Sequence, residues 1–207
     1  MGFEALRRED LTDLAAINDS YLEFLAGNGG HAARQLESLE PAAREMIRRL
    51  PAASRAEVAK CPVLLCSVRS VDVGRVDSTG NFELFRGSTP TMDLIAYMSF
   101  SLLRRIAWRR PFVARLLGGI DSEWCEALAA LDDPGLALLA HVQGCRLRPV
   151  HAAVPGFWPE LLQCAELAPL RRHAVRAAGL QLQQHRPPPL PGRIAASRVR
   201  ASRHRPA

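Results

Sequence analysis

Four arginines around one tryptophan form the densest group of chemically active side chains in the sequence. They occur as two pairs, Arg104-Arg105 and Arg109-Arg110, on either side of Trp108. Guanidinium groups in such a cluster bind phosphate oxygens, which predicts a DNA contact by a helix-turn-helix-like element. Arginines near a helix end also compensate the helix dipole and stay solvated, and on the residues alone the two interpretations have equal weight.

The cysteines and histidines do not form a recognisable metal or catalytic motif. No two of the five cysteines have the C-x-x-C spacing of a zinc knuckle or a redox site. His141 and Cys145 lie one helical turn apart and are the local candidates for two metal ligands or for an activated thiol. A capping histidine beside a buried thiol explains the same pair without any chemistry. We therefore expect no metal site and no cofactor.

Sequence signatures of other enzyme classes do not occur either. The chain has no P-loop, no dinucleotide-binding glycine motif after a strand and no nucleophile elbow. Carboxylates share helix faces at Glu37 with Glu40 and at Glu123 with Glu126, but no base or metal ligand accompanies them. The sequence therefore predicts that the protein is not an enzyme.

The composition is typical of a globular protein. Of the 207 residues, 48% are hydrophobic and 23% are charged, which suffices for a core and excludes a wholly disordered chain. No apolar stretch approaches the roughly 20 residues of a membrane span, and the N-terminus lacks the apolar segment of a secretion signal. A cytoplasmic location without membrane contact is therefore expected.

The net charge of +6 is concentrated near the C-terminus. Residues 1–170 carry 18 basic and 21 acidic side chains, whereas residues 171–207 carry nine arginines and no acid. The proline-rich stretch 187–191 forbids helix, and apolar periodicity is lacking after it, so this tail is predicted to be disordered. Two interpretations remain: an arm that adds affinity for nucleic acid, or a solvated extension.

Apolar residues at steps of three and four predict an all-α body with many helices. In the first block, helices are expected over 11–26, 31–39, 41–50 and 54–60. The stretch 63–73 is the strand candidate, because it is rich in valine and leucine, and 74–89 is predicted to be a loop. In the second block, a long helix opens at Thr89-Pro90 and is interrupted at Pro111, and further helices are expected over 112–117, 122–131, 134–141 and 158–167.

Helix ends are predicted from the capping residues. Asp10 and Ser54 are the expected N-caps of two helices in the first block, and Asp121 or Ser122 caps one in the second. The chain is thus divided into a helical region 1–73, a second helical region 74–170 and the basic tail 171–207.

The two helical blocks align with each other without a gap. A shift of 81 residues places 14–59 on 95–140 with eleven identities in 46 positions. Helices rich in alanine and leucine also align by chance, so a duplication is the less favoured of the two explanations. A duplicated chain would bury against itself a face that a single block must bury by forming a dimer.

Residues 17–22, Ile-Asn-Asp-Ser-Tyr-Leu, resemble the first-helix signature Ile-Asn-x-Ser-Tyr-Leu of FlhD, a family of bacterial flagellar transcriptional regulators. Residues 64–69, Leu-Leu-Cys-Ser-Val-Arg, resemble the Leu-Val-Cys-x-Phe-Arg segment of the same family. The resemblance covers residues 11–105, about half of the chain.

This resemblance implies an all-α dimer that binds promoter DNA together with an FlhC-like partner subunit and activates transcription. The zinc of such a complex belongs to FlhC. The family cysteine at the position of Cys66 can bridge two protomers, which makes Cys66 the candidate for an interchain disulfide. The DNA-contacting part of the family follows that cysteine, where this chain has Arg104, Arg105, Arg109 and Arg110.

The expected function is therefore a regulator of transcription, with flagellar genes as candidate targets. It would act as a homodimer or, if the blocks are duplicated, as an internal pseudo-dimer. The alternative function is a helical protein-interaction module without any DNA role.

Overall fold

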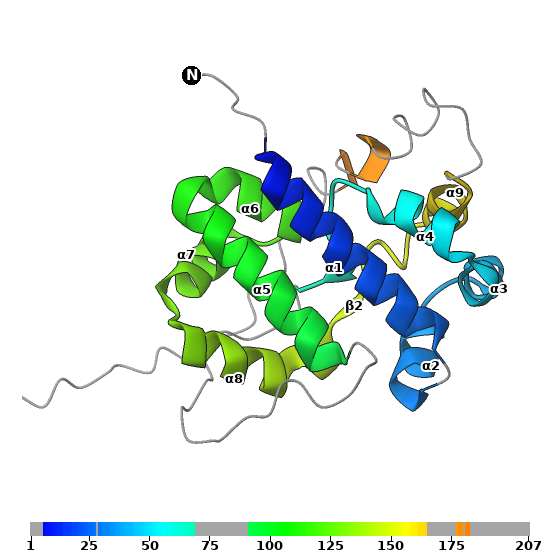
Figure 1. Cartoon of the computed structure of the whole chain (residues 1–207), viewed down its shortest axis with the longest axis horizontal. Helices are drawn as coiled ribbons and strands as arrows, with labels where there is room; N and C mark the ends of the chain where they lie inside the picture. The colour runs from blue at the N-terminus through cyan, green and yellow to red at the C-terminus, as the bar shows by residue number, and fades with distance from the viewer. Residues whose placement is uncertain (1–5, 28, 69–90, 165–176, 180, 183–207) are drawn as a thin grey trace, which may run out of the picture.

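The computed structural model describes residues 6–27, 29–68, 91–164, 177–179 and 181–182, and these residues are mostly helical (Figure 1). The helices are α1 (Arg8–Ala26), α2 (Gly30–Leu36), α3 (Pro41–Arg49), α4 (Ala52–Ala59), α5 (Met92–Arg109), α6 (Pro111–Gly118), α7 (Ser122–Ala130), α8 (Asp133–Gln143), a 3-10 turn (Gly144–Arg146) and α9 (Phe157–Gln163). The strands β1 (Cys66–Ser67) and β2 (Arg148–Pro149) pair antiparallel. None of these helices is long and apolar enough to cross a membrane. Most of the basic tail 171–207 lies outside the described residues, but 177–179 and 181–182 are helical, so the prediction of disorder is wrong for these five residues.

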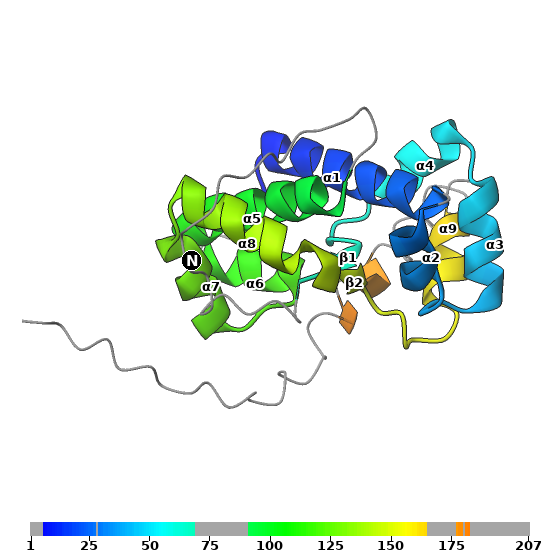
Figure 2. The same ribbon diagram turned by 90° about the horizontal axis from the view of Figure 1, so that it is seen from below.

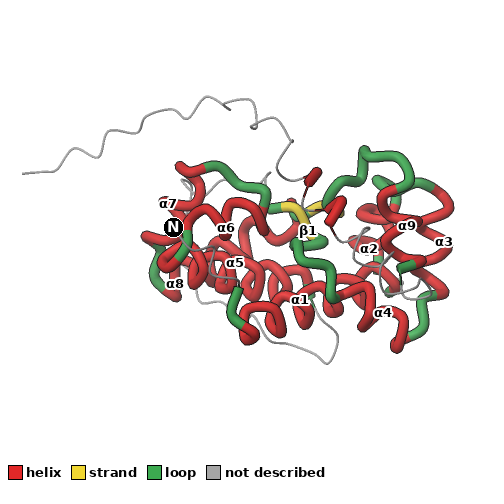
Figure 3. The backbone as a smooth tube through the Cα atoms, turned by 90° about the horizontal axis from the view of Figure 1, so that it is seen from above, coloured by secondary structure: helices red, strands yellow, loops and turns green. Residues whose placement is uncertain are grey.

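Two long helices, α1 and α5, pack against each other at the centre of the molecule (Figure 1). Helices α2, α3, α4 and α9 gather at one end, and α6, α7 and α8 gather at the other (Figures 1 and 2). The β1–β2 pair lies between these two groups (Figure 3). The strand pair and the two long helices therefore form the junction of the two ends.

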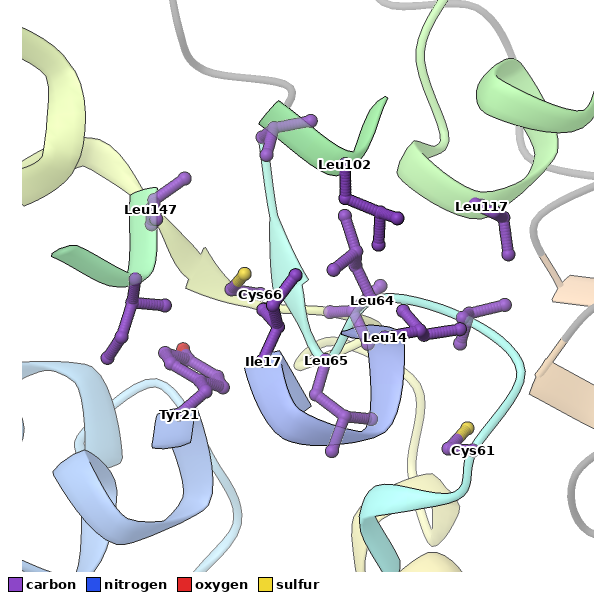
Figure 4. Packing of buried hydrophobic residues seen from close by; sticks show 14 of the residues in the cluster. Leu14, Ile17, Tyr21, Cys61, Leu64, Leu65, Cys66, Leu102, Leu117 and Leu147 are labelled. Carbon is purple, nitrogen blue, oxygen red and sulfur yellow. The ribbon is translucent and has the colours of Figure 1, made fainter. Parts of the chain in front are cut away.

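The core is continuous through this junction. The buried face of α1 has the predicted spacing of three and four residues and includes Leu14, Ile17, Tyr21 and Leu25. These side chains belong to one cluster that extends to Leu147 and the residues of α5 (Figure 4). The helical periodicity of Leu11, Leu14, Ile17, Tyr21 and Leu25 therefore identified the core face of the first helix except at Leu11, which is 44% exposed.

Side-chain caps fix the starts of α5 and α7 in the second block. Thr91 accepts a hydrogen bond from the amide of Leu94 at the start of α5, at 3.2 Å. Asp121 accepts from Trp124 at 2.7 Å, which confirms it as the N-cap of α7. Each cap satisfies one of the amides that a helix start leaves without a partner.

Two of the expected N-caps in the first block are wrong. Helix α1 begins at Arg8 rather than after Asp10, and α4 begins at Ala52 after Pro51 rather than at Ser54. Asp10 lies in the first turn of α1, where its carboxylate binds two arginines of α5. The Asp10 carboxylate, which the local sequence predicted as a helix cap, therefore forms tertiary ion pairs instead.

The predicted strand over 63–73 is much shorter than expected. Of its described residues, 63–68, only Cys66 and Ser67 form a strand, while 69–73 lie outside the described part of the chain. The carbonyl of Val63 and the amide of Leu65 bond to the side chain of Asn18 instead of to a neighbouring strand. Its partner strand, β2, was not anticipated, because two residues are too few to show alternation.

Candidate functional site

The predicted arginine cluster lies at the C-terminal end of α5. Arg104 donates to the carbonyl of Leu131 at 2.8 Å and forms an ion pair with Asp133 at the start of α8. Its guanidinium carbon lies 4.9 Å from the centre of the Trp108 ring, within the range of a cation–π contact. Arg104 is thereby held against α7 and α8 rather than projecting into solvent.

Arg105 and Arg109 face the other way, toward the first turn of α1. Arg109 lies 2.9 Å from the carboxylate of Asp10, and Arg105 lies 3.2 Å from the same oxygen. Arg105 also pairs with Asp13, and this hydrogen bond raises the pKa of its guanidinium. The Asp10 side chain is only 6% exposed, so the carboxylate is enclosed by the two cations.

The fourth member of the cluster, Arg110, connects α5 to α6. It is the N-cap residue of α6, and its amide bonds to the carbonyl of Ile106. Phe112 and Trp108, on either side of it, are 57% and 62% exposed. The structure thus brings the four arginines together at the C-terminal end of α5. Arg104 binds α8 on one side of the helix, and Arg105 and Arg109 bind α1 on the other.

The acidic partners of these arginines were missed by sequence reasoning. The ion pair between Asp10 and Arg109 joins residues 99 positions apart, and no local rule connects them. The one available signal was the spacing of Asp10 and Asp13, which lie three residues apart and therefore on one face of α1.

Replacing Asp10 with asparagine should lower the free energy of unfolding by about 1–2 kcal/mol, because Arg105 and Arg109 lose their shared carboxylate in a mostly buried site. Replacing Asp13 should cost less than about 1 kcal/mol, since that carboxylate is 49% exposed. Urea unfolding of Asp10→Asn and Asp13→Asn measures both. Equal costs would contradict a role for the enclosed carboxylate.

Cys66, the candidate for an interchain disulfide, lies deep in the junction. Its side chain is fully buried beside Tyr21, Ile17 and Leu147 (Figure 4). The sulfur lies 3.4 Å from the hydroxyl oxygen of Ser99 on α5. Burial raises the pKa of the Cys66 thiol to about 11. A second chain would reach this sulfur only after the core opened.

The other described thiols show the same environment. Cys61, Cys125 and Cys164 are buried. Burial also raises the pKa of Cys125. Reactive cysteines require a depressed pKa and access to solvent, so these positions offer no activated nucleophile.

The structure describes the side chain of only one member of the His141–Cys145 candidate. His141 lies 3.0 Å from a carboxylate oxygen of Asp93 and is half-exposed. The side chain of Cys145 is outside the described part of the chain. Among the described residues, no group of three or more histidine, cysteine, aspartate or glutamate side chains is arranged to hold a metal ion.

Asn18 is the most extensively bonded polar side chain of the junction. Its amide nitrogen lies 3.1, 3.2 and 3.0 Å from the carbonyls of Ala59, Cys61 and Val63. Its oxygen accepts the amide hydrogen of Leu65 at 2.9 Å. One buried side chain of α1 therefore positions the whole segment that leads into β1.

A second buried contact joins α1 to the far half of the chain. The Tyr21 hydroxyl donates to Gln35 at 2.7 Å, and the Gln35 amide donates to the carbonyl of Leu147 at 2.7 Å. Burial also raises the pKa of the Tyr21 hydroxyl well above its ordinary value.

Comparison with protein-family models, with curated proteins and with solved structures finds no match to this chain.

Proposed function

We propose that the chain is an FlhD-like regulator of transcription, which binds promoter DNA together with an FlhC-like partner subunit. The fold would then be an FlhD-like arrangement of two tandem helical blocks. Activation of transcription, with flagellar genes as candidate targets, is the role that this resemblance implies for a cytoplasmic protein.

One observation carries this proposal. The two segments that resemble the family, 17–22 and 64–69, are distant in sequence but bonded to each other in the structure. Asn18 from the first segment accepts the amide hydrogen of Leu65 from the second. Asn18, a residue of the first segment, therefore holds the backbone of the second, so the two segments that carry the resemblance lie together in one part of the fold.

The position of Cys66 supports the same proposal. A cysteine that bridges two protomers of a symmetric dimer must lie close to the two-fold axis. Here Cys66 lies in β1, where the first block pairs with the second. This is the place that the resemblance would assign to it, with the second block standing where the second protomer would be.

The arginine cluster favours the alternative function. Arg104, Arg105 and Arg109 already bind Asp133, Asp13 and Asp10. A DNA phosphate at the C-terminal end of α5 would have to displace those carboxylates. A helical protein-interaction module without a DNA role is therefore the second candidate.

Charge removal separates the two functions. If the cluster binds phosphate, a variant with glutamine at Arg105 and Arg109 should bind duplex DNA more weakly. The slope of the logarithm of its binding constant against the logarithm of the salt concentration should also fall, by about 1 for each phosphate that the variant no longer neutralises. In the matched control, glutamine replaces Arg48 and Arg49. These substitutions remove the same charge from exposed positions on α3. Fluorescence anisotropy at about 50 and 200 mM salt provides the measurement.

The assay is run with a flagellar promoter duplex and a mixed-sequence duplex, each with and without purified FlhC. The proposal expects FlhC to tighten binding to the promoter duplex. An unchanged slope in the Arg105/Arg109 variant would exclude the cluster as a phosphate site. If the protein does not bind the promoter duplex either with or without FlhC, the regulator proposal fails and the protein-interaction module is the supported function.

A further inference from the structure

Under the shift of 81 residues, α1, α2, α3 and α4 correspond to α5, α6, α7 and α8. Helices α3 and α7 coincide at both ends, and α2 and α4 begin where α6 and α8 begin. The N-cap residues of these three pairs correspond as well: Gly29 with Arg110, Glu40 with Asp121, and Pro51 with Asp132. The agreement concerns backbone geometry, so shared alanine and leucine composition does not explain it.

Burial also corresponds between the blocks. The core face of α1 maps onto the core face of α5 under the same shift, and each of the following pairs is buried in both blocks: Leu14 with Ile95, Asn18 with Ser99, and Leu22 with Leu103. Asn18 and Ser99 are the two uncharged polar residues buried on these central helices. The two blocks thus use equivalent positions for their shared core.

The contacts between the blocks obey a two-fold axis, independently of sequence similarity. A two-fold rotation that exchanges the blocks exchanges each residue with the one 81 positions later. When a residue pairs with its own equivalent, the axis must therefore pass between the two residues. Ser67 pairs with Arg148 across β1 and β2, and these residues are 81 positions apart.

The two central helices agree with the same axis. Asp10 at the start of α1 binds Arg109 at the end of α5, and Asp13 binds Arg105 one turn earlier. The helices therefore run in opposite directions, as equivalent helices must when they cross a perpendicular two-fold axis.

From these observations we infer that the chain is a duplicated unit folded as a single-chain pseudo-dimer. The second block occupies the surface on which a second copy of the first would dock. The inference does not require DNA binding, so it can fail or succeed separately from the proposed function. The blocks also differ: the exposed Trp108 and Phe112 have Gly27 and His31 at the equivalent positions.

A cysteine opposite Cys66 tests this inference. Cys66 pairs with Pro149, and the neighbouring amide of Val150 donates to the carbonyl of Leu65 at 2.8 Å. The Cys66–Pro149 pair therefore occupies a non-hydrogen-bonded position, where the Cα atoms are about 4.5 Å apart and a disulfide fits. The variant Pro149→Cys should close a bridge within one chain when the protein, unfolded in urea, refolds in a mixture of reduced and oxidised glutathione, because the buried thiol is then accessible to the oxidant before the core closes.

The expected result is a monomer of 22.7 kDa for the unmodified chain by light scattering, and for Pro149→Cys a bridge within the monomer. Mass spectrometry identifies the linked peptides, and a non-reducing gel shows whether chains are joined. The control Arg148→Cys, which faces away from Cys66 in the pair with Ser67, should not bridge. A dimeric unmodified chain, a bridge between chains, or a monomer without the bridge in Pro149→Cys would overturn the inference.

Discussion

Asn18→Ala should lower the free energy of unfolding by at least about 3 kcal/mol, because it leaves several buried backbone groups without partners. The side chain has no exposed surface and bonds to three carbonyls and one amide of the segment between α4 and β1. Water cannot replace these bonds without entering the core. The loss would therefore exceed the cost of deleting an ordinary surface hydrogen bond.

The control for this experiment is the equivalent position in the second block. Ser99 is equally buried, but its hydroxyl bonds to the carbonyl of Ile95 in its own helix, whose backbone bonds remain after its removal. Ser99→Ala should cost about 1 kcal/mol or less. Urea unfolding followed by circular dichroism measures both variants. If the two variants lose similar stability, Asn18 does not organise the segment as argued.

The second large expected effect is slow alkylation of Cys66 in the folded protein. Its pKa of about 11 lies well above the ordinary value of 9.0, so the thiolate at neutral pH is about 100-fold scarcer than for an unperturbed thiol. Burial restricts access further. Iodoacetamide should therefore modify Cys66 at least about 100-fold more slowly in the folded protein than in urea, as measured by peptide mass spectrometry.

The unfolded protein in urea serves as the control, because all five thiols are then accessible. Without reductant, the unmodified chain should also run as a single band on a non-reducing gel. A disulfide-linked dimer through Cys66 would contradict the buried position of the sulfur. It would instead support the interchain bridge that the resemblance implies.

The same pKa predicts a loss of stability at alkaline pH. The folded state holds the Cys66 proton more tightly than the unfolded state, so this contribution is fully present below pH 9 and is lost as pH rises toward 11. Once the pH exceeds the pKa of the folded state, the unfolding free energy has fallen by about 2–3 kcal/mol through this group. Tyr21 acts in the same direction, because burial raises its pKa as well. Between pH 9 and 11, Cys66→Ala should therefore show a smaller decline in unfolding free energy than the unmodified chain.

Much of the fold could be predicted because its signals are local. The spacing of apolar residues from Leu11 to Leu25 identified the first helix and all of its predicted buried face except Leu11, which is exposed. The predicted helices of the second block occur close to their expected limits, since Asp121 and the prolines mark their starts. Such features depend on residues within one or two helical turns.

The candidate site could be predicted only in part. The arginines were recognised by type and spacing, but their partners Asp10, Asp13 and Asp133 were not. Without the fold, a guanidinium pair that holds two helices together cannot be distinguished from one that faces a ligand. The N-cap prediction for Asp10 failed for the same reason, because the carboxylate is bound by a distant helix.

The sequence by itself determined the helical composition, the uneven distribution of charge and the alignment of 14–59 with 95–140. The tertiary structure decided whether that alignment has physical meaning. Pairing of Ser67 with Arg148 across the junction depends on contacts between residues 81 positions apart, which no local pattern encodes. Cys66 likewise became a buried thiol because the second block covers it, and only the folded chain brings that cover into place.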